Sequence, residues 1–247
     1  MCLMSIIIPC YNEFDCIDIL YKKSLFITNN YDIEIIFVDN GSNDGSIKKF
    51  RDLKKSKKIK FNRIPINKGY GYGIKNSIYL CSGEYIGWTH ADLQTDLFDV
   101  IKAYEIISKL NSNLINKKLI LKGVRHGRSY IDIFFSNSMS LISYILFFPL
   151  KTYEICAQPS IFHNSIRNII DNAPNGYEFD VHVFLVALIR NFIPYRFPVL
   201  FPERQYGKSH WNINIISKIN FIRIMFFYLI KIFIYERLLP LLKIIKK

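Results

Sequence analysis

The chain has 247 residues and a mass of 29.1 kDa, which suits one large domain or two small ones. Half of its residues are hydrophobic and 15% are aromatic, so a sizeable core is available and global disorder is excluded. The formal net charge of +13 favours anionic partners such as nucleotides, phosphates, anionic lipids or nucleic acid.

Cysteine usage indicates neither a disulfide framework nor a zinc site. The five cysteines are widely spaced and form no CxxC pair: Cys2, Cys10, Cys16, Cys81 and Cys156. We therefore expect a reducing cytosol. The N-terminus lacks a basic region and Pro9 interrupts its apolar run, which predicts a strand and not a signal peptide.

The first half of the chain alternates predicted strands and helices. Short apolar or β-branched runs predict strands over 5–8, 33–38, 60–64, 85–88 and 119–122. Apolar residues at helical spacing predict helices over 15–27, 46–53, 71–80 and 96–110. This order predicts an α/β fold with a doubly wound, mostly parallel sheet. In such sheets ligands bind beyond the carboxyl ends of the strands.

The second half is more apolar. Residues 131–150 form a long apolar run, but Asp132, Asn137 and several serines interrupt it. We therefore expect a buried helix, or a helix in a membrane surface, and not a membrane span. A helix is predicted over 180–189, and 194–197 is expected to return to the sheet.

The C-terminal segment 213–247 is apolar, with Lys and Arg distributed through it. One interpretation is a pair of amphipathic helices that lie in a membrane interface and are anchored by cations. The other is a helix that caps the core. We expect 1–212 to form the globular domain and 213–247 to form this basic helical tail.

Three polar loops follow three of the predicted strands, at 11–13, 39–44 and 90–96. Each loop alone is typical of turns and helix caps. Because the carboxyl ends of parallel strands meet at one sheet edge, the loops together predict a cluster of carboxylates. Such a cluster suits a hard cation that holds a diphosphate.

Four segments resemble, in order and spacing, the inverting family 2 glycosyltransferases of the GT-A fold: SIIIPCYNE, IIFVDNGSNDGS, NKGYGYGIKNSI and GEYIGWTHADLQTD. The chain is most similar to the branch of dolichyl- or polyprenyl-phosphate sugar synthases. Three later segments share this likeness: KGVRHGR, AQPSIFH and RFPVLFPERQYGKSHWN. The resemblance implies a nucleotide-diphosphate sugar as donor.

The resemblance also implies which residues surround the nucleotide: Pro9, Tyr11, Glu13, Asp39, Asn67, Lys68, Gly69 and Ala91. Asp39 would hydrogen-bond the base. A carboxylate accepts from a base N–H, which selects a UDP- or GDP-type donor. Gly69 would let the backbone approach the ligand.

The family's metal motif is usually Asp-Ala-Asp followed by Leu-Gln, and here it reads HADLQ over 90–94. Alternate residues of an extended segment face the same side, so His90, Asp92 and Gln94 can converge on Mn²⁺ or Mg²⁺. Imidazole suits Mn²⁺ better than Mg²⁺, so His90 leaves open which metal is used and whether one is needed. His90 can also face the diphosphate without binding metal.

Basic residues are implied to share the charge of the diphosphate. Arg204 and Lys208 match the family's Arg-x-x-Gly-x-Ser pattern, in a loop implied to close over it. Arg125 and Arg128 would assist there or hold a lipid phosphate. A hydroxyl acceptor needs a base, for which Asp180 is the first choice, with a helix N-cap as its alternative role.

The leading function is glycosyl transfer to a membrane-associated acceptor at the inner face of the cytoplasmic membrane. The acceptor is a polyprenyl phosphate or a lipid-linked or surface glycan. A catalytically degenerate nucleotide-binding protein of the same fold is the alternative that His90 allows. Nucleotidyl transfer usually needs a Gly-rich basic first loop, which PCYNE is not. No zinc-finger spacing, RNA-recognition signature or Arg block supports nucleic-acid binding.

Overall fold

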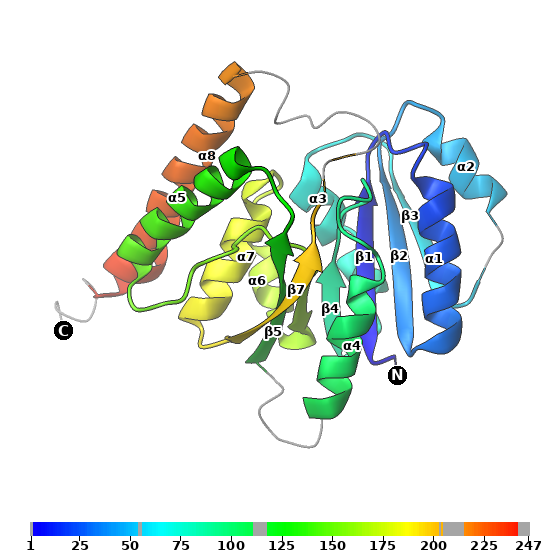
Figure 1. Cartoon of the computed structure of the whole chain (residues 1–247), viewed down its shortest axis with the longest axis horizontal. Coiled ribbons are helices and arrows are strands. Elements are labelled where there is room, and N and C mark those ends of the chain that lie inside the picture. The colour runs from blue at the N-terminus through cyan, green and yellow to red at the C-terminus, as the bar shows by residue number, and fades with distance from the viewer. Residues whose placement is uncertain (1, 54–55, 111–117, 203, 205–214, 242–247) are drawn as a thin grey trace.

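The computed structural model describes residues 2–53, 56–110, 118–202, 204 and 215–241, which form one seven-stranded sheet covered by helices (Figure 1). The strand order is β3-β2-β1-β4-β6-β5-β7. Strand β6 runs antiparallel to both neighbours, and the other pairings are parallel. This confirms the mostly parallel α/β sheet. The strands are β1 Met4–Cys10, β2 Ile33–Asn40, β3 Ile59–Ile64, β4 Tyr85–Trp88, β5 Leu119–His126, β6 Ser160–His163 and β7 Ile193–Leu200.

Most predicted helices are present in the described residues, and a short helix over 167–171 was not predicted. The helix predicted over 71–80 is divided into α3 and a 3₁₀ helix at Ile78–Leu80. Strand β6 was not predicted. The α-helices are α1 Ile17–Asn30, α2 Ser46–Asp52, α3 Tyr70–Lys75, α4 Asp99–Leu110, α5 Tyr130–Phe147, α6 Arg167–Asp171, α7 Glu178–Ile189 and α8 Ile215–Phe233.

Two hydrophobic clusters pack on opposite faces of the sheet. Ile6 and Phe37 belong to the cluster that contains the buried faces of α1 and α4. Trp88 and Phe184 belong to the other cluster, which contains residues of α3, α6 and α7. Every residue of β2 is buried, as expected for a parallel strand covered on both faces. The two layers hold the strand ends rigidly beneath the loops.

Helices α5 and α8 depart from the sequence expectations. Within α5 only Ser143 and Phe147 are buried, so it is not a core helix. By length and composition alone, α5 is long and apolar enough to cross a membrane, and 11% of it is buried. The interrupting serines had predicted that it would not be a membrane span. Helix α8 continues through a π-helical turn at Ile234–Leu238, so 215–241 is one helix and not a pair. The predicted boundary at residue 212 lies outside the described residues.

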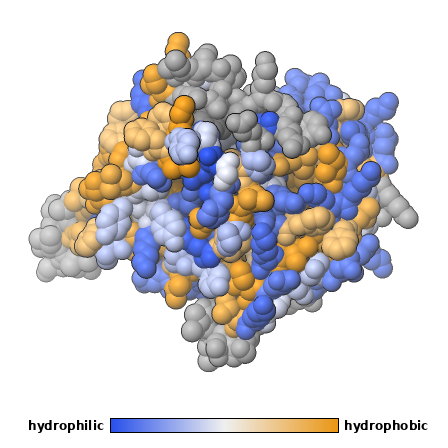
Figure 2. All heavy atoms as spheres, in the orientation of Figure 1, coloured by the Kyte–Doolittle hydropathy of each residue, from blue (hydrophilic) through white to orange (hydrophobic). Residues whose placement is uncertain are grey.

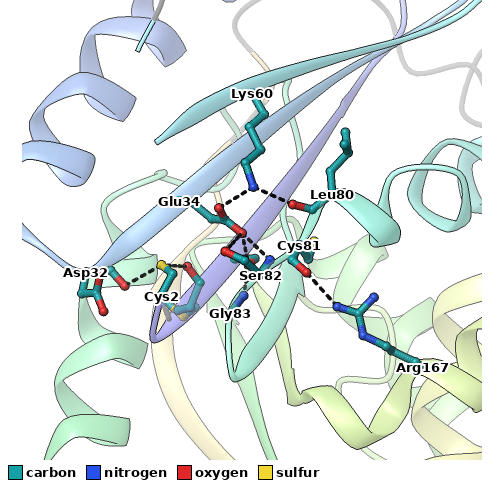
Figure 3. Close-up of polar contacts among 11 residues, drawn as sticks. Cys2, Asp32, Glu34, Lys60, Leu80, Cys81, Ser82, Gly83 and Arg167 are labelled. Atoms are coloured by element: carbon teal, nitrogen blue, oxygen red, sulfur yellow. Dashed lines mark hydrogen bonds and ion pairs between the residues drawn. The ribbon is translucent and has the colours of Figure 1, made fainter. Parts of the chain in front are cut away.

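A buried carboxylate fixes the amino-terminal edge of the sheet (Figure 3). Glu34 Oε1 accepts hydrogen bonds from Ser5 Oγ at 2.6 Å and from the backbone N and Oγ of Ser82 at 2.6 and 2.9 Å. Lys60 Nζ lies 2.7 Å from Glu34 Oε2 and also donates to the Leu80 carbonyl at 2.7 Å. One carboxylate therefore ties β1, β2 and β3 to the loop that precedes β4.

We expect Glu34→Gln to lower the free energy of unfolding at pH 7 by roughly 1–3 kcal/mol, because an amide cannot accept from all of these donors. Burial alone would raise the pKa of Glu34, but the hydrogen bonds from Lys60, Ser5 and Ser82 outweigh it and lower the pKa below its ordinary 4.5. A lowered pKa gives stability that is complete above the unfolded-state value and is lost as the pH falls. Urea unfolding should therefore show a gap between wild type and variant that narrows from pH 7 to pH 3.

The matched control is Glu84→Gln in the same loop. The Glu84 side chain is 47% exposed and lies 4.0 Å from His163 Nε2. We expect this variant to unfold like wild type, since exposed pairs contribute little. An equal loss in both variants, or a gap that is constant with pH, would contradict the role given to Glu34.

Candidate active site

The ends of β1, β2 and β4 place three loops beside one another. In the sheet register, Cys10 at the end of β1 pairs with Asp39, and Ile7 pairs with Trp88 at the end of β4. The loops that begin at Tyr11, Gly41 and Thr89 therefore leave the same sheet edge. The parallel sheet brings the three predicted polar loops together.

Asn12 locks the first two loops to each other. Its backbone has φ = 56°, a left-handed conformation that asparagine tolerates better than most residues. The Asn12 backbone N donates to Ser42 Oγ at 3.1 Å, and its side-chain Oδ1 accepts from Asn43 N at 2.9 Å. These reciprocal bonds set the position of the neighbouring Glu13.

Asp39 is buried with one carboxylate oxygen unsatisfied. Its Oδ1 accepts from the backbone N of Ser42 at 3.1 Å, whereas Oδ2 is buried and has no hydrogen-bond partner. The nearest cation, Arg63 Nε, is 3.8 Å from Oδ2, too far for a hydrogen bond. An orphaned acceptor in a buried position is costly, so it marks a place where a ligand N–H can bind.

The predicted loop of Asn67, Lys68 and Gly69 borders the same edge. Gly69 has φ = 113°, and a Cβ there would come within 2.3 Å of the Asn175 carbonyl, so only glycine fits. The Gly69 carbonyl accepts from Asn40 Nδ2 at 3.0 Å, and Asn67 Oδ1 accepts from Gly69 N at 2.8 Å. The exposed Lys68 Nζ lies 5.3 Å from the centre of the Tyr72 ring.

Arg204 brings two of the loops together by charge. It donates from Nη2 to Glu13 Oε1 at 2.5 Å, and its Nη1 is 4.0 Å from Asp92 Oδ2. Burial raises the pKa of Glu13, the Arg204 charge opposes this, and the Asp92 charge adds to it. The structure therefore groups three of the predicted residues, Glu13, Asp92 and Arg204, at one point.

The HADLQ segment is bent and not extended. Leu93 has φ = 61°, and Asp92 Oδ1 accepts from Gln94 N at 3.1 Å, which is an Asx turn. Gln94 Nε2 donates to the Pro202 carbonyl at 3.2 Å, and the His90 ring centre lies 6.3 Å from that of Tyr70. Alternate residues of a bent segment do not have to face one side. Convergence of His90, Asp92 and Gln94 on a metal therefore stays a prediction.

A divalent cation fits this site through Asp92. Within the described part of the chain, no three His, Cys, Asp or Glu side chains are grouped so as to hold a metal. Mg²⁺ needs only one or two carboxylates when substrate phosphates and waters supply its other ligands. The Asp92 carboxylate, now beside Arg204, has the chemistry for that role.

Asp180 is the centre of a buried hydrogen-bond network. Its Oδ1 accepts from Trp88 Nε1 at 2.7 Å and its Oδ2 accepts from Gln158 Nε2 at 3.1 Å. Gln158 Nε2 also lies 3.3 Å from the Tyr70 hydroxyl. Burial raises the pKa of Asp180, while the charge of Lys122 opposes the rise. Asp180 lies in the first turn of α7, whose N-cap is Tyr177, so the alternative N-cap role was wrong.

Lys122 is a buried cation that the sequence analysis missed. It is 1% exposed and donates to the Ala157 carbonyl at 2.8 Å and to Ser160 Oγ at 2.6 Å. Burial lowers its pKa to about 8, against the opposing charge of Asp180. Lysine in a strand otherwise apolar over Leu119–Gly123 was the available signal. Gln158 lay within the AQPSIFH segment, but no signal marked it individually.

Arg125 and Arg128 meet at one carboxylate. Arg125 Nε lies 2.7 Å from Glu154 Oε2, and Arg128 Nη2 lies 2.5 Å from Glu154 Oε1. Arg128 Nη1 also donates to Ser136 Oγ of α5 at 2.7 Å, while its Nε is buried without a hydrogen bond. Glu154 has φ = 52° and had no sequence signal. The two arginines form a group of their own beside α5.

The remaining predicted residues lie along the first and third loops or outside the description. Pro9 and Tyr11 are partly exposed at the end of β1, and Ala91 is 4% exposed beside His90. Lys208 lies outside the described residues. The nucleotide, metal and catalytic roles given to all of these residues stay predictions.

Part of the chain is similar in sequence to known glycosyltransferases. A dolichyl-phosphate beta-glucosyltransferase of Dictyostelium discoideum is 29% identical over 121 residues, which are 44% of this chain and 37% of that relative. CsbB of Bacillus subtilis (strain 168) is 32% identical over 109 residues, 42% of this chain and 33% of that relative. The chain therefore matches only about a third of the length of each curated relative.

The fold is shared with glucosyl-3-phosphoglycerate synthase of Mycobacterium tuberculosis, solved with Mn²⁺, uridine diphosphate and phosphoglyceric acid. The TM-score is 0.62 at 15% identity, covering 95% of this chain and 78% of that one. The same synthase was also solved with Mg²⁺ and uridine diphosphate. Residues 5–125 match the model of Glycosyl transferase family 2. The chain thus carries a glycosyltransferase family 2 domain on a GT-A fold.

Proposed function

We propose that the protein is an inverting glycosyltransferase that uses a UDP- or GDP-type sugar donor. The acceptor is membrane-associated, a polyprenyl phosphate or a lipid-linked or surface glycan, and the reaction takes place at the inner face of the cytoplasmic membrane. The observation that carries the proposal is the buried, unsatisfied Asp39 Oδ2 at the strand end that the family resemblance assigns to the base. A nucleobase N–H would satisfy it.

Support for the diphosphate comes from the Glu13, Arg204 and Asp92 group. Arg204 already occupies the space between two carboxylates, so a bound diphosphate can take over its fork of donors. A divalent ion, when bound, supplies positive charge that neutralises the departing diphosphate. Asp92 would hold that ion, and His90 and Gln94 remain candidate ligands.

Support for a phosphate-bearing acceptor comes from Arg125 and Arg128. Both guanidinium groups converge on Glu154, and Arg128 keeps a buried Nε without a partner. The Dictyostelium relative is named for dolichyl phosphate, and the mycobacterial structure contains phosphoglyceric acid. An ionised phosphate needs no base, which fits an Asp180 whose two oxygens are already engaged.

The first test is calorimetric titration with UDP, GDP, CDP and dTDP, each with Mn²⁺, Mg²⁺ or chelator. We expect one of UDP and GDP to bind most tightly, and to bind more tightly with a cation. Asp39→Asn should weaken that binding by about ten- to a hundredfold, because it loses a buried acceptor. Asp32→Asn is the matched control, since the Asp32 side chain is 49% exposed at the opposite end of β2.

Binding of no diphosphate would refute the proposed donor. Binding without any transfer to a polyprenyl phosphate or glycan acceptor would instead favour the catalytically degenerate protein. If the Asp39→Asn variant binds the nucleoside diphosphate as tightly as wild type, Asp39 does not contact the base.

Asp92→Asn should lower the turnover of donor by roughly 10²–10³-fold, because a neutral amide holds the cation at the leaving diphosphate less strongly. The control, Asp96→Asn, removes a carboxylate of the same loop that pairs with Lys23 at 2.7 Å. We expect it to retain near-wild-type turnover in a donor-release assay. Full activity in Asp92→Asn would show that the cation is held elsewhere.

Asp180→Asn should lower the free energy of unfolding by roughly 1–3 kcal/mol, because the amide cannot accept from both Trp88 and Gln158 without turning its NH₂ toward one of them. Glu178→Gln, in the same helical turn, is the control and should unfold like wild type. Urea titration followed by circular dichroism measures both. Unchanged stability in Asp180→Asn would mean that the network contributes little.

A further inference from the structure

The inner side of α5 carries three serines beside apolar residues that pack on the core. Ser136 Oγ accepts from Arg128, the Ser140 carbonyl accepts from Thr152 Oγ1 at 3.2 Å, and Ser143 is fully buried. At 3.6 residues per turn these three serines form one stripe along the helix. That stripe is the side of α5 that contacts the domain.

The opposite side of α5 is apolar and exposed. Phe134, Leu141 and Ile145 are 67%, 59% and 68% exposed. Their spacing puts them within about 40° of one another and roughly opposite the serine stripe. An ordinary surface helix has a polar outer side. The exposed apolar side of α5 therefore indicates an apolar partner outside the protein.

Helix α8 lies beside α5 and extends the same surface (Figure 1). Its inner residues Met225, Leu229 and Ile232 are buried in the core, and the Phe233 ring centre is 6.1 Å from that of Phe147 in α5. Hydrophobic residues gather over the end of the molecule that these helices form (Figure 2). We call this the α5–α8 surface, whose exposed residues include Phe134, Leu141, Ile145, Phe148, Ile216, Ile219 and Phe227.

Positive charge borders this apolar surface. A groove of about 380 Å³ on α8 is lined by Arg223 and Lys231 together with Ile224, Phe227 and Tyr228. Helix α8 has no acidic residue between Ile215 and Phe233, and its continuation has Glu236 next to Arg237. The one carboxylate of α5, Asp132, accepts a hydrogen bond from Ser129 at the helix start. Apolar and aromatic side chains with interspersed cations are typical of helices that lie on anionic membranes.

We propose that the α5–α8 surface docks the protein onto an anionic lipid bilayer, with both helices lying in the plane of the interface. A span through the bilayer is excluded for α5 in this fold, because its serine stripe is held to the domain. A second copy is disfavoured, because a self-complementary contact over the groove would place Arg223 and Lys231 against like charges. This docking surface rests on the proposed function for its link to the acceptor, and it identifies which part of the protein would contact the membrane.

Docking would bring the membrane next to the arginine pair. Arg128 is bonded both to Glu154 and to Ser136 on the inner side of α5. A bilayer on the outer side of α5 therefore places lipid headgroups about one helix diameter, roughly 10 Å, from this group.

Vesicle flotation of the full chain tests the proposal. We expect wild type to float with vesicles of phosphatidylcholine and phosphatidylglycerol, and less with phosphatidylcholine alone. The triple variant Phe134→Ser, Leu141→Ser, Ile145→Ser should lose at least about tenfold in partitioning, because three exposed apolar side chains no longer enter the lipid. Arg223→Ala with Lys231→Ala should reduce the preference for the anionic vesicles.

Tyr79→Ser is the matched control, because Tyr79 is 68% exposed, like Ile145, but lies in Ile78–Leu80 outside both helices. It should float like wild type. Wild type that ignores both vesicles, or a triple variant that floats equally, would overturn the proposal. So would a wild-type dimer that the triple variant converts to a monomer without any flotation, since the surface would then serve a second copy.

Nucleotide titration of the same variants separates this inference from the proposed function. A protein that floats but binds no diphosphate keeps its membrane surface and loses the glycosyltransferase proposal. A protein that binds a diphosphate but never floats keeps the donor site and loses the membrane surface. The triple variant should bind the diphosphate as tightly as wild type, because its changes lie on the outer side of α5.

Discussion

The geometry of the candidate site depends on the buried carboxylate of Asp180. Its hydrogen bonds to Trp88 and Gln158 tie α7 to β4 and to the segment that precedes β6. Trp88 is the last residue of β4, so the loop that carries Asp92 begins at a point that Asp180 holds. Burying a carboxylate is costly unless donors and an opposite charge compensate. The two donors and the nearby Lys122 supply that compensation.

The antiparallel strand β6 divides the sheet into two parts with different contents. The carboxylates Glu13, Asp39 and Asp92 lie at the ends of β1, β2 and β4, whereas β5 carries Lys122 and Arg125. Because β6 returns against both β4 and β5, the connection from β5 to β6 contains α5 and Glu154. Arg128, Glu154 and the exposed helix α5 thus belong to this one connection, and Arg125 lies in β5 just before it.

Much of the sheet could be predicted from the sequence, because the parallel strands contain short apolar or β-branched runs between polar loops. Strand β6 could not, since four residues in SIFH carry too little pattern to distinguish a strand from a loop. Which side of α5 faces the domain could not be predicted either. The serines only interrupt an apolar run in the sequence, and the structure shows that Ser136, Ser140 and Ser143 face the domain. Among site residues, Asp39, Glu13 and Asp92 followed from strand ends, whereas Glu154 and Gln158 act through contacts distant in sequence.

Charge pairing in the site suggests how ligands would enter it. Arg204 pairs with Glu13 and Asp92, and Arg125 and Arg128 share Glu154, so the cations are already neutralised in this state. A phosphate must therefore displace a carboxylate from these arginines. The free energy gained is then the difference between the new ion pair and the one it replaces. Asp39 differs, because its Oδ2 has no hydrogen-bond donor to displace. A base N–H that binds Asp39 therefore forms a hydrogen bond without breaking one inside the protein. We expect this contact to contribute more than the phosphate contacts to the choice between donor nucleotides.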